Sequence, residues 1–155
     1  MNPAMQTLHF SILINAPKEK VWHAMLDDEP YREWTKVFHE GSYYKGSWEK
    51  GSKILFLGPD PKTGEEGGMV SRIAENTPHE FISIEHLGIV QNGVEDTTSE
   101  EAQKWAPAFE NYTLKDQDGA TEVLVDMDVD EKESEEFKKM WPAALERLKA
   151  LAERT

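Results

Sequence analysis

The sequence predicts an α+β fold in which a curved antiparallel sheet of seven strands wraps around one long C-terminal helix. Short stretches of alternating apolar residues, separated by turns rich in Gly, Pro and Asn, predict strands joined mainly by hairpins. The final stretch, 134–155, instead carries apolar residues at helical spacing. A helix with one apolar face must be buried against the sheet, and a strongly twisted sheet of seven strands curls. The pattern therefore predicts a space enclosed between the sheet and the helix.

The chain begins with a strand and two short helices. Residues 8–15, "LHFSILIN", alternate apolar and polar side chains, which is typical of a half-buried strand. Pro17 suits the first turn of the helix that follows, whose apolar face includes Trp22. "DDEP" ends this helix, and "PYREWT" predicts one further turn. We expect Trp22 to be core and Trp34, after the break, to border the enclosed space.

Six further strands and one helical insertion make up the middle of the chain. We place the strands near residues 40–45, 52–58, 68–76, 79–88, 108–116 and 120–130. Within 89–107, "TTSEEAQKW" predicts a short capped helix ending near Trp105, and we expect this stretch to gate the enclosed space. "DQDG" predicts a hairpin turn between the last two strands.

The chain closes with one long amphipathic helix. Its apolar stripe consists of Phe137, Met140, Trp141, Ala144, Leu145, Leu148 and Leu151. Pro142 removes a backbone hydrogen bond from this helix, which predicts either a kink or a fresh helical start at this residue.

Composition excludes several classes of protein. The 155 residues predict a single domain, 1–155, whose core needs no disulfide, and the chain contains no cysteine. A net charge of −13 repels nucleic-acid phosphates and anionic lipid, so we expect neither nucleic acid nor a membrane as a partner. No secretory signal and no apolar run long enough to cross a bilayer is visible, which predicts a cytoplasmic protein.

No motif in the sequence indicates a reaction, a metal or a cofactor. Asp126, Asp128 and Asp130 match the first three ligand positions of a calcium loop, but Glu131 and Phe137 stand where that loop needs Gly and Glu. The five histidines are scattered and lack metal-ligand spacing. We therefore expect no catalytic residue, no metal site and no cofactor.

Aromatic and methionine side chains are the strongest functional signal. The candidate cavity-lining residues are Trp34, Phe38, Phe56, Met69, His86, Trp105, Tyr112, Met140 and Trp141. They lie on elements that converge on the enclosed space, and such linings suit flat apolar ligands. His86 alternates with Ile82 and Ile84 and so faces the interior, either as a hydrogen-bonded core histidine or as a polar anchor for a ligand. The alternative is a filled core, in which these side chains only contact one another.

Three stretches of the chain resemble a known superfamily. "APKEKVWHAML…YREW", "EEGGMVSRIAENTPHEFISIEH" and the terminal "W…AL..LK.L" are similar to the helix-grip fold of the START and birch-pollen-allergen (SRPBCC) superfamily. Within it the chain most resembles the branch named after the activator of the 90-kDa heat-shock protein's ATPase, over roughly residues 8–152. The resemblance implies a seven-stranded sheet, two small helices that close one end, and a long helix across its mouth.

The members of this superfamily include ligand carriers, co-chaperones and cyclases, so three functions stand as expectations. The first is non-enzymatic binding of a small lipophilic or aromatic molecule between the sheet and the long helix. The second is a co-chaperone that contacts a heat-shock ATPase through its acidic face. The third is a polyketide cyclase-like enzyme, which requires an acid–base pair that the sequence does not reveal.

Overall fold

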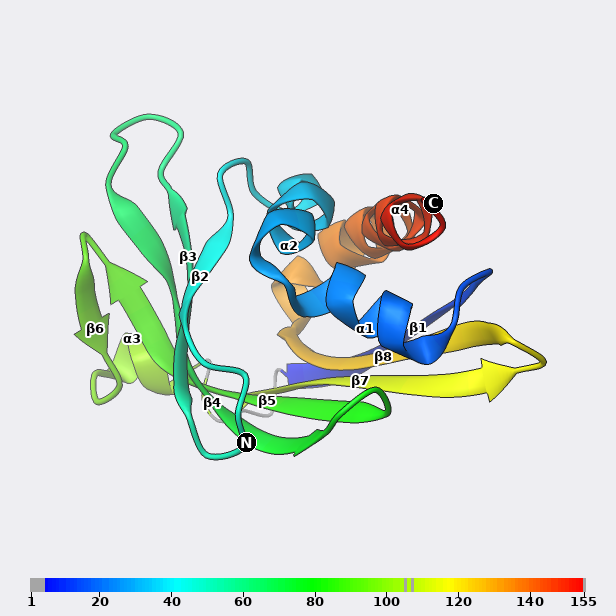
Figure 1. Cartoon of the computed structure of the whole chain (residues 1–155). Helices are drawn as coiled ribbons and strands as arrows, with labels where there is room; N and C mark the ends of the chain where they lie inside the picture. The colour runs from blue at the N-terminus through cyan, green and yellow to red at the C-terminus, as the bar shows by residue number, and fades with distance from the viewer. Residues whose placement is uncertain (1–4, 105, 107, 155) are drawn as a thin grey trace.

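The protein's structure, a computed structural model, describes residues 5–104, 106 and 108–154 (Figure 1). In chain order the elements are β1 (Met5–Ile14), α1 (Lys18–Leu26), α2 (Asp28–Trp34), η1 (Thr35–Val37), β2 (Tyr43–Gly46), β3 (Lys53–Pro59), β4 (Glu66–Thr77), β5 (Phe81–Gln91), β6 (Val94–Asp96), α3 (Glu100–Gln103), β7 (Ala108–Gln117), β8 (Ala120–Asp130), η2 (Glu131–Glu133) and α4 (Ser134–Ala152).

The strands form one curved antiparallel sheet, as the sequence predicts. Seven strands follow the order β1-β8-β7-β5-β4-β3-β2, and β6 pairs with β5 beside this path. Helices α1, α2 and α4 lie on the concave side of the sheet (Figure 1). The additional strand β6 forms because Asn92 and Gly93 both take positive φ, 52° and 75°, which suits a tight hairpin turn. This strand was not predicted, although Asn-Gly between apolar stretches is a hairpin signal.

Aromatic side chains stabilise the break between α1 and α2. The last carbonyls of a helix have no partner within it, and here they accept side-chain hydrogen bonds instead. Trp34 Nε1 donates to the Met25 carbonyl at 3.1 Å. The Leu26 carbonyl accepts from the Tyr44 hydroxyl at 2.7 Å and from Trp48 Nε1 at 3.1 Å. Trp34 therefore holds the second helix against the end of the first.

Helix α4 runs as a single element from Ser134 to Ala152 and continues through Pro142, so the fresh helical start is not found. Pro142 lies on the exposed face of the helix. The opposite face is buried at Trp141, Ala144, Leu145 and Leu148, as the apolar stripe predicts. It packs against β1 and the two short helices.

The segment between β5 and β7 continues the sheet before it turns into a helix. Helix α3 begins at Glu100, and the Ser99 hydroxyl accepts from the Ala102 N–H at its start. It ends at Gln103, earlier than expected, and Trp105 lies outside the described residues. The end of β6 lies close against β5 at Gly88. A Cβ added to Gly88 would meet the Asp96 carbonyl oxygen at 2.2 Å, so only glycine fits here without a shift of the backbone.

Candidate functional site

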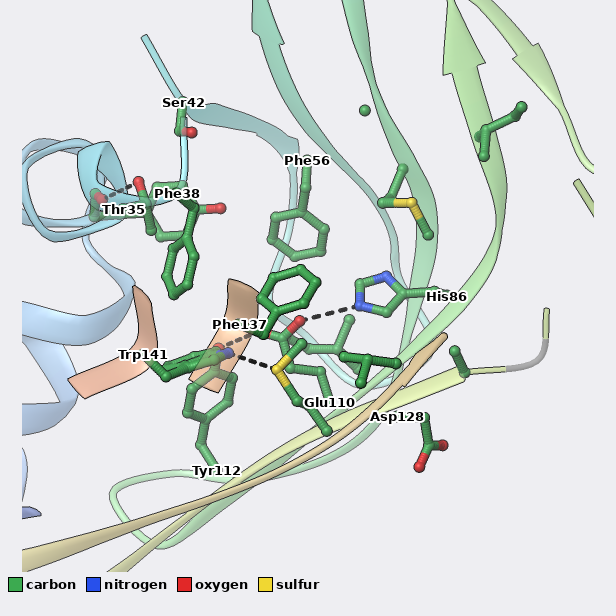
Figure 2. A pocket seen from close by; sticks show the side chains of 18 of the residues that line it. Thr35, Phe38, Ser42, Phe56, His86, Glu110, Tyr112, Asp128, Phe137 and Trp141 are labelled. Carbon is green, nitrogen blue, oxygen red and sulfur yellow. Dashed lines mark hydrogen bonds and ion pairs between the residues drawn. The ribbon is translucent and has the colours of Figure 1, made fainter. Parts of the chain in front are cut away.

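A cavity of about 440 Å³ lies between the concave face of the sheet and helix α4 (Figure 2). Eight aromatic residues line it: Tyr31, Trp34, Phe38, Trp48, Phe56, Tyr112, Phe137 and Trp141. They come from both sides of the cavity. Helices α2 and α4 and the residue after η1 supply five of them, whereas β3, β7 and the loop before β3 supply Phe56, Tyr112 and Trp48. The space predicted between sheet and helix is therefore open rather than filled.

The structure places seven of the nine candidate residues around this cavity. They are Trp34, Phe38, Phe56, Met69, His86, Tyr112 and Trp141. Met140 is not among the lining residues, and Trp105 lies outside the described part of the chain. Trp22 is buried in the core away from the cavity, in agreement with its position on α1.

Helix geometry explains why Met140 does not reach the cavity. Phe137 and Trp141 are four residues apart, so they lie one above the other on the same helix face, and both line the cavity. Met140 is rotated by about 100° from Trp141 around the helix axis. It is half-buried at the flank of the helix.

Trp141 is the centre of the aromatic wall. Its ring centroid lies 4.8 Å from that of Phe38, 6.0 Å from that of Trp34 and 6.1 Å from that of Tyr112. Its indole N–H donates to the sulfur of Met127, which fixes the ring orientation. These contacts hold the indole rigidly where it lines the cavity, as part of a broad apolar surface.

A chain of polar side chains crosses the sheet side of the cavity, from His86 to Tyr112 beside Trp141 (Figure 2). The Ser71 hydroxyl lies 2.7 Å from Nδ1 of His86, and Nε2 of His86 lies 3.1 Å from Oε1 of Glu110. The Tyr112 hydroxyl donates to the other carboxylate oxygen, Oε2 of Glu110. His86, Glu110 and Tyr112 line the cavity, whereas Ser71 is fully buried behind the imidazole.

Strand register brings these four residues together. A β-bulge in β5 leaves Leu87 without a partner, so Gly88 pairs with Val70 while His86 pairs with Ser71. On the other side of β5, His86 pairs with Ala108, which makes Glu110 its diagonal neighbour on the same face.

The carboxylate of Glu110 contributes to a raised pKa in two tyrosines that line the cavity. Burial, the charge of Glu110 and the hydrogen bond to Glu110 raise the pKa of Tyr112 well above its usual value. Burial and, to a smaller extent, the charge of Glu110 raise the pKa of Tyr31 in the same direction. Both phenols therefore keep their protons at neutral pH, and Tyr112 donates its proton to Glu110.

Sequence reasoning missed Glu110, which is the central member of the polar chain. Its position was visible in principle, because Glu110 alternates with Tyr112 and Leu114 along β7 and so faces the same side. Its pairing with His86 was not visible, since it depends on which strand lies beside β5.

Within the described ranges, no group of three or more His, Asp or Glu side chains is arranged to hold a metal ion. The same part of the chain contains no helix that is long and apolar enough to cross a membrane.

Comparisons with known proteins show the family and the fold. The family model described as Activator of Hsp90 ATPase homolog 1-like protein matches residues 15–153. No curated protein matches the sequence. Among solved structures, a protein of Mesorhizobium loti superposes with a TM-score of 0.69 at 17% identity, over 97% of this chain and 98% of that one. A protein of Cytophaga hutchinsonii also gives 0.69, at 23% identity, over 96% and 94% of the two chains. A protein of Chromobacterium violaceum gives 0.67 at 19% identity, over 97% and 99%.

Proposed function

The chain belongs to the Activator of Hsp90 ATPase homolog 1-like family, and we propose that it binds a small hydrophobic or aromatic molecule in the cavity between the sheet and α4. Proteins of this fold often bind hydrophobic ligands. The observation that carries the proposal is the cavity itself, which is large enough for a flat organic molecule and is walled by eight aromatic residues.

The size of the apolar contact supports an affinity near the micromolar range. Burying roughly 300 Å² of ligand surface at about 25 cal/mol/Å² contributes about −7.5 kcal/mol before entropic costs. Micromolar binding requires about −8 kcal/mol. An apolar ligand therefore needs at least one polar contact to bind tightly, and His86, Glu110 and Tyr112 provide polar groups in the cavity.

Phe137 offers the most direct test of the site. It is half-buried, faces the cavity from α4 and contacts Phe38 with a ring-centroid distance of 6.2 Å. We expect Phe137→Ala to weaken binding of a naphthalene-type probe about tenfold, because the variant loses one face of the apolar contact. Backbone-amide NMR titration of the labelled protein measures both the affinity and the location of the shifts.

Phe81→Ala is the matched control, because Phe81 is also half-buried but lies on β5 outside the cavity lining. This variant should bind the probe as the parent protein does. Equal losses in both variants, or no shift from a broad panel of apolar compounds, would contradict the proposed site.

One observation favours a second candidate function, acid–base catalysis of the cyclase type. His86 and Glu110 form a hydrogen-bonded pair inside an apolar cavity, which is the kind of pair that proton transfer requires. Turnover of an enolisable polyketide-type substrate that is lost in His86→Gln would support this candidate. Binding of such a substrate without turnover would contradict catalysis and would indicate that the pocket only binds its ligand.

A further inference from the structure

We propose that the ligand of this cavity carries a protonated amine on its apolar or aromatic body, and that Glu110 binds the ammonium group. This inference rests on the proposed function, because it assigns a chemical class to the ligand of the same pocket. Four observations support it: the hydrogen bonds of Glu110, the charges that line the cavity, the aromatic walls and the net charge of the chain.

The carboxylate of Glu110 faces the cavity with unused acceptor capacity. Its side chain is 20% exposed, and each of its two oxygens accepts one hydrogen bond, from His86 or from Tyr112. A carboxylate has about four acceptor positions, so roughly two remain open toward the cavity. A purely apolar ligand would remove water from these positions and leave them unsatisfied, whereas an ammonium group would occupy them.

The neighbours of Glu110 do not require a positive charge to satisfy their own hydrogen bonds. With the Ser71 hydroxyl donating to Nδ1 and Nε2–H donating to Glu110, a neutral His86 imidazole completes the chain. Tyr112 keeps its phenolic proton and donates it to the same carboxylate. In this arrangement the negative charge of Glu110 is stabilised by hydrogen bonds, and neither Lys nor Arg lines the described cavity to pair with it.

All other formally charged residues that line the described cavity are also acidic, and neither Lys nor Arg is among them. Asp128 turns its carboxylate away from the cavity toward Thr7 and the Phe109 N–H (Figure 2). Glu133 and Glu101 remain on the rim. Burial and the charges of Asp130 and Glu136 raise the pKa of Glu133, so a nearby cation would relieve this repulsion.

The walls that face Glu110 suit a cation as well as an apolar body. The faces of Trp, Tyr and Phe rings attract cations, and Trp34, Trp141 and Tyr31 all line the cavity. The net charge of −13 attracts cationic molecules and repels anionic ones over longer distances. Carboxylate lipids such as fatty acids therefore meet repulsion both outside the cavity and within it.

Three compounds with the same ring system distinguish the contribution of the ligand's charge to the affinity from the contribution of its apolar contact. They are 1-naphthylmethylamine, which is cationic at pH 7, neutral 1-naphthylmethanol and anionic 1-naphthoate. We expect the amine to bind at least about tenfold more tightly than the alcohol, and the carboxylate to bind most weakly. Calorimetric or NMR titrations at pH 7 and low ionic strength measure the three dissociation constants.

Glu110→Gln tests whether Glu110 is the residue that binds the ammonium group. The variant keeps the shape of the side chain and should reduce the advantage of the amine over the alcohol about tenfold, while the affinity for the alcohol changes less than about threefold. Glu146→Gln is the control, because Glu146 is exposed on α4 and the substitution changes the net charge equally. Glu133→Gln at the rim should reduce the amine's advantage by a smaller factor, which gives a second readout if Glu110→Gln unfolds.

The outcomes distinguish this inference from the function on which it rests. Equal binding of amine and alcohol, or tightest binding of the carboxylate, overturns the inference and leaves a hydrophobic pocket. The same follows if Glu110→Gln and Glu146→Gln have equal effects on a folded protein. If none of the three compounds binds, the proposed function fails and the inference fails with it.

Discussion

Replacing Trp34 with Phe tests how the two short helices are held together. The indole N–H of Trp34 donates to the Met25 carbonyl at 3.1 Å, and Trp34 is only 3% exposed. Among the described residues no other donor reaches this carbonyl, so the substitution leaves a buried acceptor unsatisfied, at a cost of about 1–3 kcal/mol. The smaller ring also loses packing, which costs roughly 1 kcal/mol more. We expect a total loss of about 2–4 kcal/mol in the free energy of unfolding, or roughly 4–16 °C in Tm.

Trp48→Phe is the matched control for this prediction. Trp48 is half-buried and donates to the Leu26 carbonyl, which keeps the hydrogen bond from Tyr44 when the indole N–H is removed. The loss should therefore be only about 1 kcal/mol. Chemical denaturation followed by circular dichroism measures both variants. If Trp48→Phe loses as much stability as Trp34→Phe, the capping hydrogen bond of Trp34 is not what stabilises the helix break.

Two further predictions concern the tyrosines and a glycine. Burial raises the pKa of Tyr31 and of Tyr112 above the ordinary value of 10.0, and burial with Glu66 raises that of Tyr43 to about 12. Because the unfolded chain loses these protons near pH 10, the stability that they contribute is complete below that pH and is lost as pH rises through the raised values. Absorbance at 295 nm should show Tyr31 and Tyr112 ionising only as circular dichroism reports unfolding; ionisation of both near pH 10 in the folded protein would contradict this. Gly88→Ala should destabilise the fold by about 1–3 kcal/mol, because the new Cβ meets the carbonyl oxygen of Asp96, at the end of β6, at 2.2 Å. Gly67→Ala, where the nearest atom is 3.5 Å away, should cost less than about 1 kcal/mol in the same denaturation experiment.

The strands, the helix and the inward-facing side chains that could be predicted all follow from the local spacing of apolar residues. Alternation in residues 8–15 predicted a strand, and β1 occupies Met5–Ile14. The apolar stripe after residue 134 predicted the long helix, and α4 begins at Ser134. The same alternation along β5 placed His86 on the interior face, where it lines the cavity. Each of these features repeats along the chain, so neighbouring residues are enough to reveal it.

The predictions that failed or were missing depend on contacts between distant segments. Met140 belongs to the apolar stripe, yet the rotation of α4 against the sheet leaves it at the flank of the helix, outside the cavity lining. Pro142 carries no sequence signal that distinguishes a continuous helix from a fresh start. The pairing of His86 with Glu110 joins residues 24 positions apart, so it required the register of β5 against β7.

The sequence by itself determined the class of elements, their order and the apolar face of each, because these follow from side-chain period and turn chemistry over a few residues. It also determined the acidic charge of the chain. Only the tertiary structure decided that the enclosed space is open and that Glu110 lies within it. Strand register, the bulge at Leu87 and the packing of α4 set these features, and each depends on how distant surfaces pack rather than on any local pattern.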